Sequence, residues 1–389
     1  MRIAMLGTRG VPASYGGFET AVEEIGRRLV ERGHEVVVYG DRTHRHIREH
    51  LGMRVVHVPS VPLKQLETLS RTALAAMHAA TAPPFDAAFV FNAANAPFVP
   101  LLRASGIPVA VHVDGLEWRR AKWGRAGRGY YRWAERTAVR SADALIADAP
   151  GIAAYYREEF QAPTVLLRYG APILQDPDLE RVREVGLEPG RFHLVVARFE
   201  PENHVLEIVR GYCASAATMP LAVVGSAPYS AAYTDAIRTE ASGDRRVRLL
   251  GGVWDAALLD ALYAASRTYV HGHSVGGTNP SLLRAMGAGA AVVAFDVAFN
   301  TEVLDSTEWT FRTEADLARI LRRAETDDLA VASRGVRARA RAAEAFRWDE
   351  VAEGYERLAR ELATSGVHAP VRGARRVARA GAAGAGPLL

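Results

Sequence analysis

The stretch HGHSVGGTNPSLL, residues 271–283, combines residue types that suit anion binding. A strand-like run ends in two glycines, and a helix is expected to begin at Asn279, followed by a proline that suits the first helical turn. Free N–H groups and the helix dipole attract anions at such a start. His271 and His273 stand at the strand end, near enough to contact the same ligand. The stretch therefore predicts a phosphate site, with Arg284 one turn into its helix.

Arg198 and Asp114 also stand where strands are expected to end. In VVARFEPENH, the Arg198 guanidinium can neutralise a phosphate through two hydrogen bonds, or pair with a neighbouring carboxylate. In AVHVDGLEWRR, the Asp114 carboxylate can act as a base or accept a hydrogen bond from a sugar hydroxyl. Taken alone, Asp114 is better explained as a cap of the next helix.

The turn GTRGVPASYGGFET after the first strand holds four glycines, among them Gly16 and Gly17. Ligands of open α/β sheets bind beside such turns, and glycine lets the backbone approach them closely. The turn matches neither G-x-G-x-x-G nor the P-loop, so it gives little support to nicotinamide or ATP binding. We expect a ligand loop here, with an ordinary strand–helix connection as the alternative.

Basic and aromatic residues alternate in residues 119–140, which hold eight Lys or Arg and one acid. This composition suits an anionic membrane surface or single-stranded nucleic acid. A solvated amphipathic helix with its aromatic rings in the core fits it equally well. The residues expected to lie at the acceptor or the membrane are Trp118, Arg119, Arg120, Lys122 and Trp123.

The composition is that of a globular protein, because apolar residues make up 49% of the 389 residues. One cysteine, no signal-like leader and no membrane-spanning run predict a cytoplasmic protein without intramolecular disulfides. Four of the 48 Lys and Arg lie in residues 364–389, which leaves 44 against 44 acids in the body. The neutral body does not indicate nucleic-acid binding, and the tail is expected to be disordered. No spacing of Cys and His predicts a metal site.

Twelve short β-rich apolar runs, from RIAML to AVVAF, alternate with segments of helical period. A six-plus-six division predicts an α/β protein of two doubly wound domains, with the break near LLRYGAPILQDPDLE. An eight-unit barrel does not fit this count. The expected parts are a first domain at 1–172, a second at 173–347, a helix at 348–363 that crosses back to the first, and a basic tail at 364–389.

Four motifs in order resemble a bacterial branch of glycosyltransferase family 4: GTRGVPASYGGFET, VDGLEWRRAKWG, ARFEPENH and HGHSVGGTNPSLL, followed by FNTEVL. The branch includes rhamnosyltransferases of cell-surface polysaccharide assembly, and the resemblance covers most of residues 1–360. It implies the GT-B fold, in which two Rossmann-like domains face each other across a cleft. It also implies a retaining, metal-independent sugar transfer, with the nucleotide-sugar donor on the C-terminal domain and the acceptor on the N-terminal one.

The resemblance implies roles by position as well. Arg198 matches an arginine on the donor diphosphate, and Asp114 stands where many members have a histidine near the reacting sugar; these two are the expected catalytic residues. The expected donor-binding residues are Gly16, Gly17, Arg198, Asn203, His271, His273, Gly276, Gly277, Thr278, Asn279, Ser281, Leu282, Arg284 and Glu302.

Three positions depart from the wider family. Gly276 and Arg284 replace two glutamates eight positions apart, and Asn203 replaces a lysine. The second glutamate usually accepts hydrogen bonds from the nucleotide ribose, which arginine cannot do because it is only a donor. A deoxyribose nucleotide such as dTDP has no 2′-hydroxyl and therefore loses less from the exchange.

We therefore expect a retaining glycosyltransferase that moves a sugar, with L-rhamnose from dTDP-rhamnose favoured, to a lipid-linked or polysaccharide acceptor. It would need no metal or other cofactor, and it would act in the cytoplasm at the inner face of the membrane. A catalytically weakened homologue that binds sugar nucleotides without transfer is the alternative, motivated by Arg284 and Asn203. A sugar-nucleotide epimerase is a further possibility.

Overall fold

The computed structural model describes residues 1–13, 16–61, 66–113, 115–120, 123–226, 230–306 and 308–366. The chain divides into two compact units. The first comprises Met1–Arg119, Trp123–Arg168 and the segment that begins at Trp348, and the second comprises Tyr169–Arg347 together with Arg120. Beyond position 366, the expected disordered tail lies outside the described residues.

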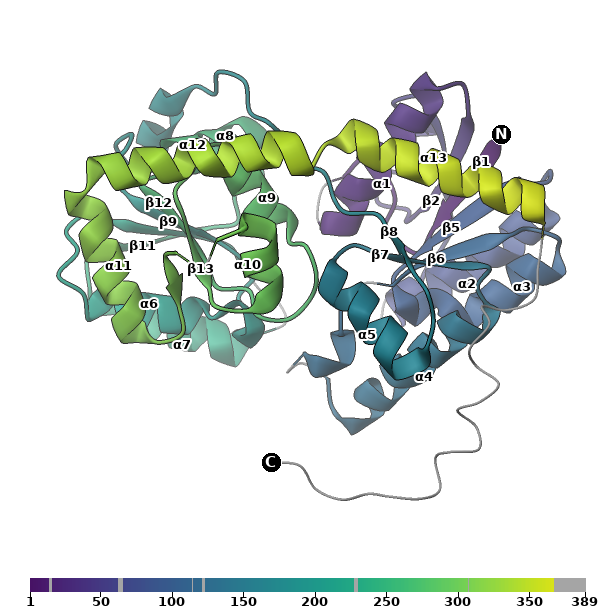
Figure 1. Cartoon of the computed structure of the whole chain (residues 1–389), viewed down its shortest axis with the longest axis horizontal. Helices are drawn as coiled ribbons and strands as arrows, with labels where there is room; N and C mark the ends of the chain where they lie inside the picture. The colour runs from purple at the N-terminus through teal and green to yellow at the C-terminus, as the bar shows by residue number, and fades with distance from the viewer. Residues whose placement is uncertain are drawn as a thin grey trace. The chain divides into compact units, whose positions relative to one another are not determined.

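The first unit is built on an eight-stranded sheet in the order β3-β4-β2-β1-β5-β6-β7-β8 (Figure 1). All neighbouring strands pair in parallel except β3 and β4. Its elements are β1 (Arg2–Leu6), α1 (Gly17–Glu31), β2 (Glu35–Gly40), β3 (Glu49–His50), β4 (Met53–His57), α2 (Glu67–Thr81), β5 (Ala87–Phe91), η1 (Ala93–Phe98), α3 (Val99–Ala104), β6 (Val109–Val113), η2 (Glu117–Arg119), α4 (Arg125–Ser141), β7 (Ala144–Ala147), α5 (Pro150–Phe160), β8 (Val165–Leu166) and α13 (Trp348–Ser365).

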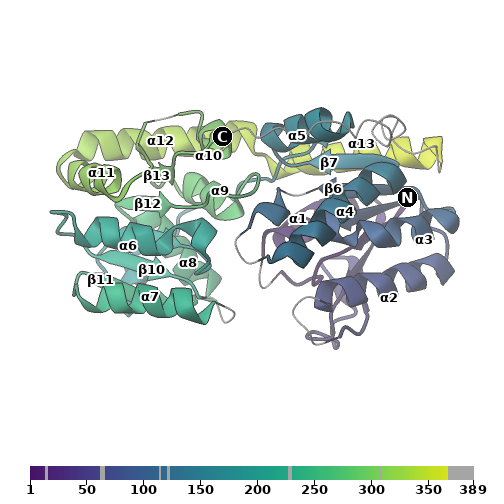
Figure 2. The same cartoon turned by 90° about the horizontal axis from the view of Figure 1, so that it is seen from below.

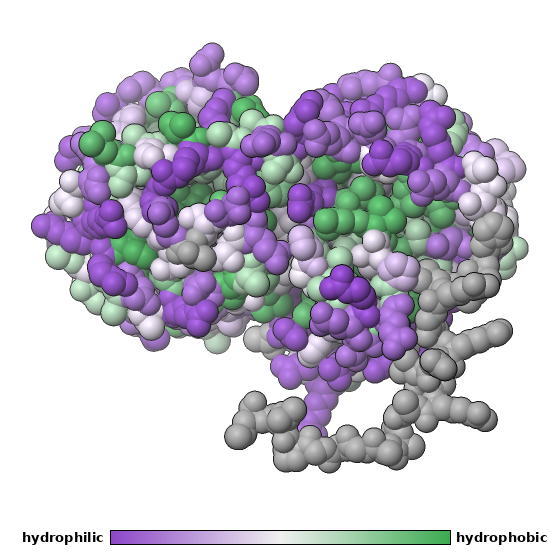
Figure 3. Space-filling model, in the orientation of Figure 1, coloured by the Kyte–Doolittle hydropathy of each residue, from purple (hydrophilic) through white to green (hydrophobic). Residues whose placement is uncertain are grey.

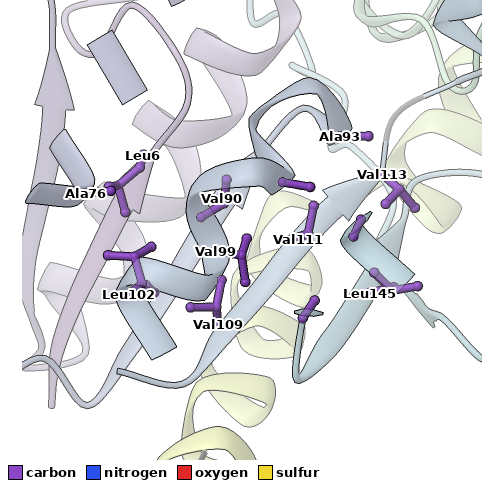
Figure 4. Packing of buried hydrophobic residues seen from close by; sticks show 14 of the residues in the cluster. Leu6, Ala76, Val90, Ala93, Val99, Leu102, Val109, Val111, Val113 and Leu145 are labelled. Atoms are coloured by element: carbon purple, nitrogen blue, oxygen red, sulfur yellow. The ribbon is translucent and has the colours of Figure 1, made fainter. Parts of the chain in front are cut away.

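Apolar side chains on one face of this sheet pack against helices α2 to α5 (Figure 4). Leu6, Val90, Val111 and Leu145 come from four neighbouring strands and are at most 1% exposed. The opposite face is covered by α1 and α13, which contact each other. Figure 2 looks onto this unit from the side of α2 to α5. Strands that are buried on both faces read as continuous apolar runs, which is why the sequence pattern finds them.

The second unit holds a six-stranded, fully parallel sheet in the order β11-β10-β9-β12-β13-β14. Helices α6, α7 and α11 pack on one face, and α8, α9 and α12 pack together on the other (Figure 1). Its elements are η3 (Leu179–Val185), β9 (His193–Val196), η4 (Pro201–Asn203), α6 (Val205–Cys213), β10 (Leu221–Val224), α7 (Ala231–Ser242), β11 (Val247–Gly251), α8 (Ala256–Ala265), β12 (Thr268–His271), α9 (Pro280–Gly287), β13 (Val292–Phe295), α10 (Ala298–Leu304), β14 (Thr310–Phe311), α11 (Glu314–Thr326) and α12 (Asp328–Ala345).

The two doubly wound α/β units confirm the predicted fold class, but the six-plus-six division of strands is wrong. TVLLR contributes β8 to the first sheet, where Val165 pairs with Ile146 of β7. Two further strands, β3 and β14, contain two residues each. Two residues are too few to show the alternation or apolar run by which a strand is predicted.

Helix α13 belongs to the first unit, as expected for a helix that crosses back. The predicted apolar face, Val351, Tyr355 and Leu358, is buried, and the Tyr355 ring lies 5.0 Å from that of Phe89 in β5. Polar contacts to α1 and the turn after it, among them Arg28 Nε to Asp349 Oδ1 at 2.6 Å, add to this packing. The C-terminal end of the described chain is thereby fixed to the first sheet.

Candidate active site

The carboxyl ends of β9 and β12 place the predicted phosphate residues side by side. These two strands are parallel neighbours, and the order of strands along the chain reverses between them. In open α/β sheets, ligands bind at the carboxyl edge beside such a reversal. Arg198 and Asn203 follow β9, and the loop at 272–279 follows β12. The predicted donor residues of the second unit, apart from Glu302 on α10, therefore come from the end of β12, these two adjacent connections and α9.

Helix α9 begins as predicted, with Asn279 as its N-cap and Pro280 in its first turn. The Asn279 side chain accepts a hydrogen bond of 2.9 Å from the Ser281 N–H, and Pro280 has no N–H. Within the described part of the chain, the Leu282 N–H makes no hydrogen bond. Gly276 adopts a φ of 141°, and a Cβ there would lie 3.0 Å from the His273 ring, so the loop needs glycine. An anion at this helix start would therefore find the Leu282 N–H still available.

The Ser281 hydroxyl is used inside the protein. Its Oγ lies 2.5 Å from the hydroxyl of Tyr263 and 2.8 Å from that of Tyr269, which is 3.1 Å from His271 Nδ1. His271 is 4% exposed, and its Nε2 makes no hydrogen bond within the described residues. Burial lowers the pKa of His271 to about 3, so the ring is neutral at physiological pH. His271 therefore shapes the strand edge and does not contribute a positive charge to it.

Hydrogen bonds from the side-chain amide of Asn203 link the loops that follow β9 and β12. Asn203 Oδ1 lies 2.7 Å from Nδ1 of His273, and Asn203 Nδ2 donates to the Arg198 carbonyl at 2.8 Å. Asn300 of α10 donates to the His273 carbonyl at 2.9 Å from the other side. Burial is the main cause that holds the pKa of His273 well below its usual value. Asn203, which replaces the lysine of the wider family, thus serves as a neutral link between the two loops.

Arg198 is the exposed cation of this edge. Within the described residues its guanidinium makes no hydrogen bond or ion pair, whereas its carbonyl holds Asn203 in place. The neighbouring Glu202 is buried, and Nη1 of Arg120 lies 3.9 Å from Glu202 Oε1. Among the residues predicted here, Arg198 is therefore the one with a positive charge available to an anion.

Arg284 is paired with Asp260 of α8, a residue that the sequence reasoning missed. Arg284 Nη2 and Nε lie 2.6 and 2.7 Å from the same oxygen, Asp260 Oδ1, and both side chains are about a quarter exposed. Arg284 Nη2 also donates to the Ala256 carbonyl at 3.4 Å. The positive charge of Arg284 is therefore balanced locally, and the other Asp260 oxygen makes no hydrogen bond within the described chain.

Trp254 and Glu302 are two further exposed residues of this unit. Trp254 follows β11, is 70% exposed, and lies so close to Gly252 that a Cβ there would be 3.1 Å from its indole nitrogen. A large exposed aromatic next to a strand end was a signal that the sequence reasoning did not use. Glu302 is exposed on α10.

The corresponding edge of the first sheet lies where the strand order reverses between β1 and β5. Gly16 caps α1 with a φ of 109°, and a Cβ there would lie 2.3 Å from Glu19 Oε2, so glycine is required; Gly17 opens the helix. Glu19 Oε1 accepts a hydrogen bond of 3.0 Å from the Arg9 N–H. Burial is the main cause that raises the pKa of Glu19.

A buried arginine from α2 supports the same loop. Arg71 is 2% exposed, donates to the Thr8 carbonyl at 3.1 Å, and lies 2.6 Å from Glu67 Oε1. Glu67 also pairs with Arg9, whose Nε is 3.4 Å away. With Glu19, this edge therefore holds two arginines and two glutamates that balance one another.

In the basic segment, several of the aromatic rings pack against neighbouring side chains, as in the solvated-helix alternative. Trp118 and Trp123 are only partly exposed: the Arg132 guanidinium lies 4.3 Å from the Trp118 ring, and Trp123 packs on Tyr131 with ring centroids 5.0 Å apart. Arg119 is exposed, whereas Arg120 is half-buried. Asp114 and Lys122 lie outside the described residues, and the roles expected for them stay predictions.

No three His, Cys, Asp or Glu side chains of the described chain lie together as a metal site would require. Among the same residues, no helix is both long and apolar enough to cross a bilayer.

Two family matches cover most of the chain. Residues 16–170 match the glycosyl transferase 4-like domain, and residues 191–327 match the glycosyl transferases group 1 family. The two matches correspond to the first and second units. The chain therefore belongs to the glycosyltransferases with the GT-B fold, and it is an enzyme of that class (EC 2.4).

Solved structures of similar fold agree with the family. A sucrose-phosphate synthase from Thermosynechococcus elongatus is 21% identical, with a TM-score of 0.81 over 94% of this chain and 99% of that one. HepE from Anabaena, solved with UDP, is 18% identical, with a TM-score of 0.72 over 93% and 100%. A trehalose-6-phosphate protein from E. coli bound with UDP-2-fluoro glucose is 12% identical, with a TM-score of 0.68 over 93% and 99%. No curated protein sequence matches the chain.

Proposed function

We propose that this glycosyltransferase transfers a sugar, with L-rhamnose favoured, from a nucleoside diphosphate donor to a lipid-linked or polysaccharide acceptor, with retention of configuration. The observation that carries the proposal is the exposed Arg198 guanidinium beside the start of α9, where the Leu282 N–H has no hydrogen-bond partner in the described chain. A cation and an N–H donor on adjacent strand ends suit a diphosphate. Relatives of the fold were solved with UDP and UDP-glucose, which supports a nucleotide-sugar donor.

In this proposal, catalysis comes from holding the leaving group. Arg198 and the Leu282 N–H stabilise the negative charge that grows on the diphosphate as the bond to the sugar breaks. The sugar then passes through an oxocarbenium-like state, and a departing phosphate oxygen accepts the proton of the acceptor hydroxyl. Asp114 stays a candidate for orienting the sugar. The proposal assigns no step to a metal, and it places the enzyme at the inner face of the membrane.

The nucleoside end of the donor is assigned to α8 and the turn before it. Trp254 offers an exposed ring on which a nucleobase can stack, an interaction that contributes about 1–3 kcal/mol per base. Arg284 cannot accept a hydrogen bond, but it holds Asp260 in place, and the second Asp260 oxygen can accept one from the nucleoside sugar. The pair therefore supplies an acceptor that Arg284 alone lacks. dTDP stays the carrier favoured by the sequence, and its deoxyribose still carries a 3′-hydroxyl that can donate to Asp260.

A donor screen tests the proposal. The purified chain is incubated with a panel of nucleotide sugars and native lipid extract, and glycosylated products are detected by mass spectrometry, with donor-only reactions as controls. We expect transfer from dTDP-rhamnose that depends on the extract. Binding of nucleotide sugars without any product would favour the weakened homologue, and conversion of the sugar without acceptor would favour an epimerase. Absence of any nucleotide binding, measured as a thermal shift, would contradict the donor site itself.

A further inference from the structure

Helix α4 of the first unit carries a row of arginines along one face. At 100° per residue, the five positions fall within an arc of about 120° and extend over about 22 Å. All five are exposed, and none forms an ion pair within the described residues. This arginine stripe consists of Arg125, Arg128, Arg132, Arg136 and Arg140.

The stripe has no exposed acidic residue on its own helix, although the buried Glu135 lies close enough to interact with Arg132 and Arg136. The only acid of α4, Glu135, is 3% exposed and accepts a hydrogen bond of 3.0 Å from the Tyr155 hydroxyl. Burial raises the pKa of Glu135 to about 7, so its negative charge is only partly present at neutral pH. Like charges spaced three or four residues apart destabilise a helix. Because the body of the chain is otherwise neutral, this concentration of charge is local to α4.

An exposed tryptophan borders the stripe. Trp133 is 50% exposed, whereas the other aromatic side chains of the segment are engaged inside: Tyr130 donates to the Ala94 carbonyl at 2.8 Å, and Trp123 packs on Tyr131. Tryptophan rings favour the head-group level of a bilayer. In Figure 3 hydrophilic side chains gather over the lower part of the first unit, where Figure 1 labels α4 and α5.

We propose that the arginine stripe, with Trp133 at its border, is the surface by which the enzyme docks on an anionic lipid bilayer. The straight row suits a flat array of phosphate head groups, because guanidinium groups pair with phosphate through two hydrogen bonds. Trp133, whose ring centroid lies 5.6 Å from that of Tyr130, is half exposed and can insert among head groups. The inference rests on the proposed membrane-bound acceptor. It moves the docking surface from Trp118–Trp123, expected from sequence, to α4.

Vesicle binding tests the inference with the full chain. The probes are vesicles of phosphatidylcholine alone and of phosphatidylcholine with phosphatidylglycerol, and bound protein is measured by sedimentation. The variant changes Arg128, Arg136 and Arg140 to Gln and retains Arg132, which packs over Trp118. At about five-fold per arginine, the affinity for anionic vesicles is expected to fall roughly a hundred-fold. Trp133→Ala is expected to reduce binding by a smaller factor.

A matched control separates the stripe from net charge. Arg319, Arg322 and Arg323 of α11 are also exposed, and changing them to Gln removes the same charge from the second unit. We expect this control to bind anionic vesicles as the wild type does. Equal losses in both variants, retained binding in the α4 variant, or a preference for single-stranded nucleic acid over anionic vesicles at the same salt would each overturn the inference.

Nucleotide binding is measured on the same samples by calorimetry, and it is expected to be equal in the wild type and both variants. Failure of the wild type to bind any nucleotide would reject the proposed function, whatever the vesicles show. Normal nucleotide binding without vesicle binding would reject the docking surface alone. The two proposals therefore fail separately.

Discussion

The carboxyl edges of the two sheets are built from similar turns, but they differ in how their arginines are paired with acidic side chains. At the first edge, the Arg71 and Arg9 guanidinium groups both pair with Glu67, and Glu19 accepts a hydrogen bond from the Arg9 backbone N–H, so both arginines have an acidic partner. At the second edge, the links between loops are neutral amides and neutral histidines, and Arg198 is left exposed. An edge whose charges cancel suits a neutral, hydroxyl-bearing group, whereas an edge with an available cation suits a diphosphate.

This contrast predicts that substitutions at the first edge change stability and those at the second change nucleotide affinity. Arg71→Met should have a large effect on folding, because it leaves Glu67 and the Thr8 carbonyl without their buried partner. Because Glu67 retains its pair with Arg9, the loss is that of a buried hydrogen-bond partner, roughly 1–3 kcal/mol in the free energy of unfolding. Urea titration measures the loss, and calorimetry is expected to find unchanged affinity for nucleoside diphosphates. A large drop in that affinity would contradict the prediction that the first edge affects stability and the second affects nucleotide binding.

The pH dependence of stability should also differ between the units. In the first unit, burial raises the pKa of Glu135 to about 7, above its unfolded value of 4.5. The stabilisation from this group is thus complete below pH 4.5 and is lost as the pH rises through 7, which amounts to about 3 kcal/mol. Glu135→Gln should retain the hydrogen bond from Tyr155 and remove this loss. The free energy of unfolding, measured by denaturation from pH 5 to pH 8, would change equally with pH in the wild type and the variant if the prediction were wrong.

In the second unit, the pKa of Glu325 is shifted in the opposite direction. Burial opposes its ionisation, but hydrogen bonds from His193, Met219 and Thr218 outweigh it and lower the pKa of Glu325 to about 2. Its contribution to stability is therefore present above pH 4.5 and is lost as the pH falls through 2. Glu325→Gln should destabilise the protein at pH 7 more than at pH 3, as followed by circular dichroism. A constant difference across that range would refute the assignment.

The smallest effect is expected for the Arg284–Asp260 pair, because partly exposed ion pairs contribute about 1 kcal/mol or less. Arg284→Glu places two carboxylates together, so both stability and nucleotide affinity should fall slightly. Adding Asp260→Arg restores an opposite pair, and the double variant should recover the stability. A large gain in turnover from Arg284→Glu alone would instead indicate that the arginine had damaged the site.

The sequence predicted those helices and strands whose pattern of apolar residues is set by burial. Strands such as β5, buried on both faces, read as apolar runs, and α13 showed its apolar face through its helical period. The loop and helix start at 272–280 were predicted because glycine, asparagine and proline have strong local backbone preferences for such loops and helix starts. These backbone preferences involve only a few neighbouring residues and do not depend on tertiary packing.

Long-range pairings could not be predicted in this way. Asp260 reaches Arg284 only because α8 and α9 pack side by side, and Arg71 reaches Thr8 across 63 positions of the chain. The same holds for the arginine stripe: the sequence showed a basic and aromatic segment, but only packing separates the buried aromatic rings from the exposed Trp133. Burial of a side chain by a distant element leaves no periodic signal in its own segment.

The most direct test of the account is nucleoside diphosphate binding by Arg198→Ala, measured by calorimetry with dTDP and UDP. Removing charge-assisted hydrogen bonds to the diphosphate is expected to weaken binding roughly thirty-fold, while urea titration shows unchanged stability because the Arg198 side chain has no partner within the described chain. Arg210→Ala, at another exposed arginine of the second unit, serves as the control and should bind as the wild type does. Equal affinity of Arg198→Ala and wild type would contradict the assignment of the diphosphate to this edge.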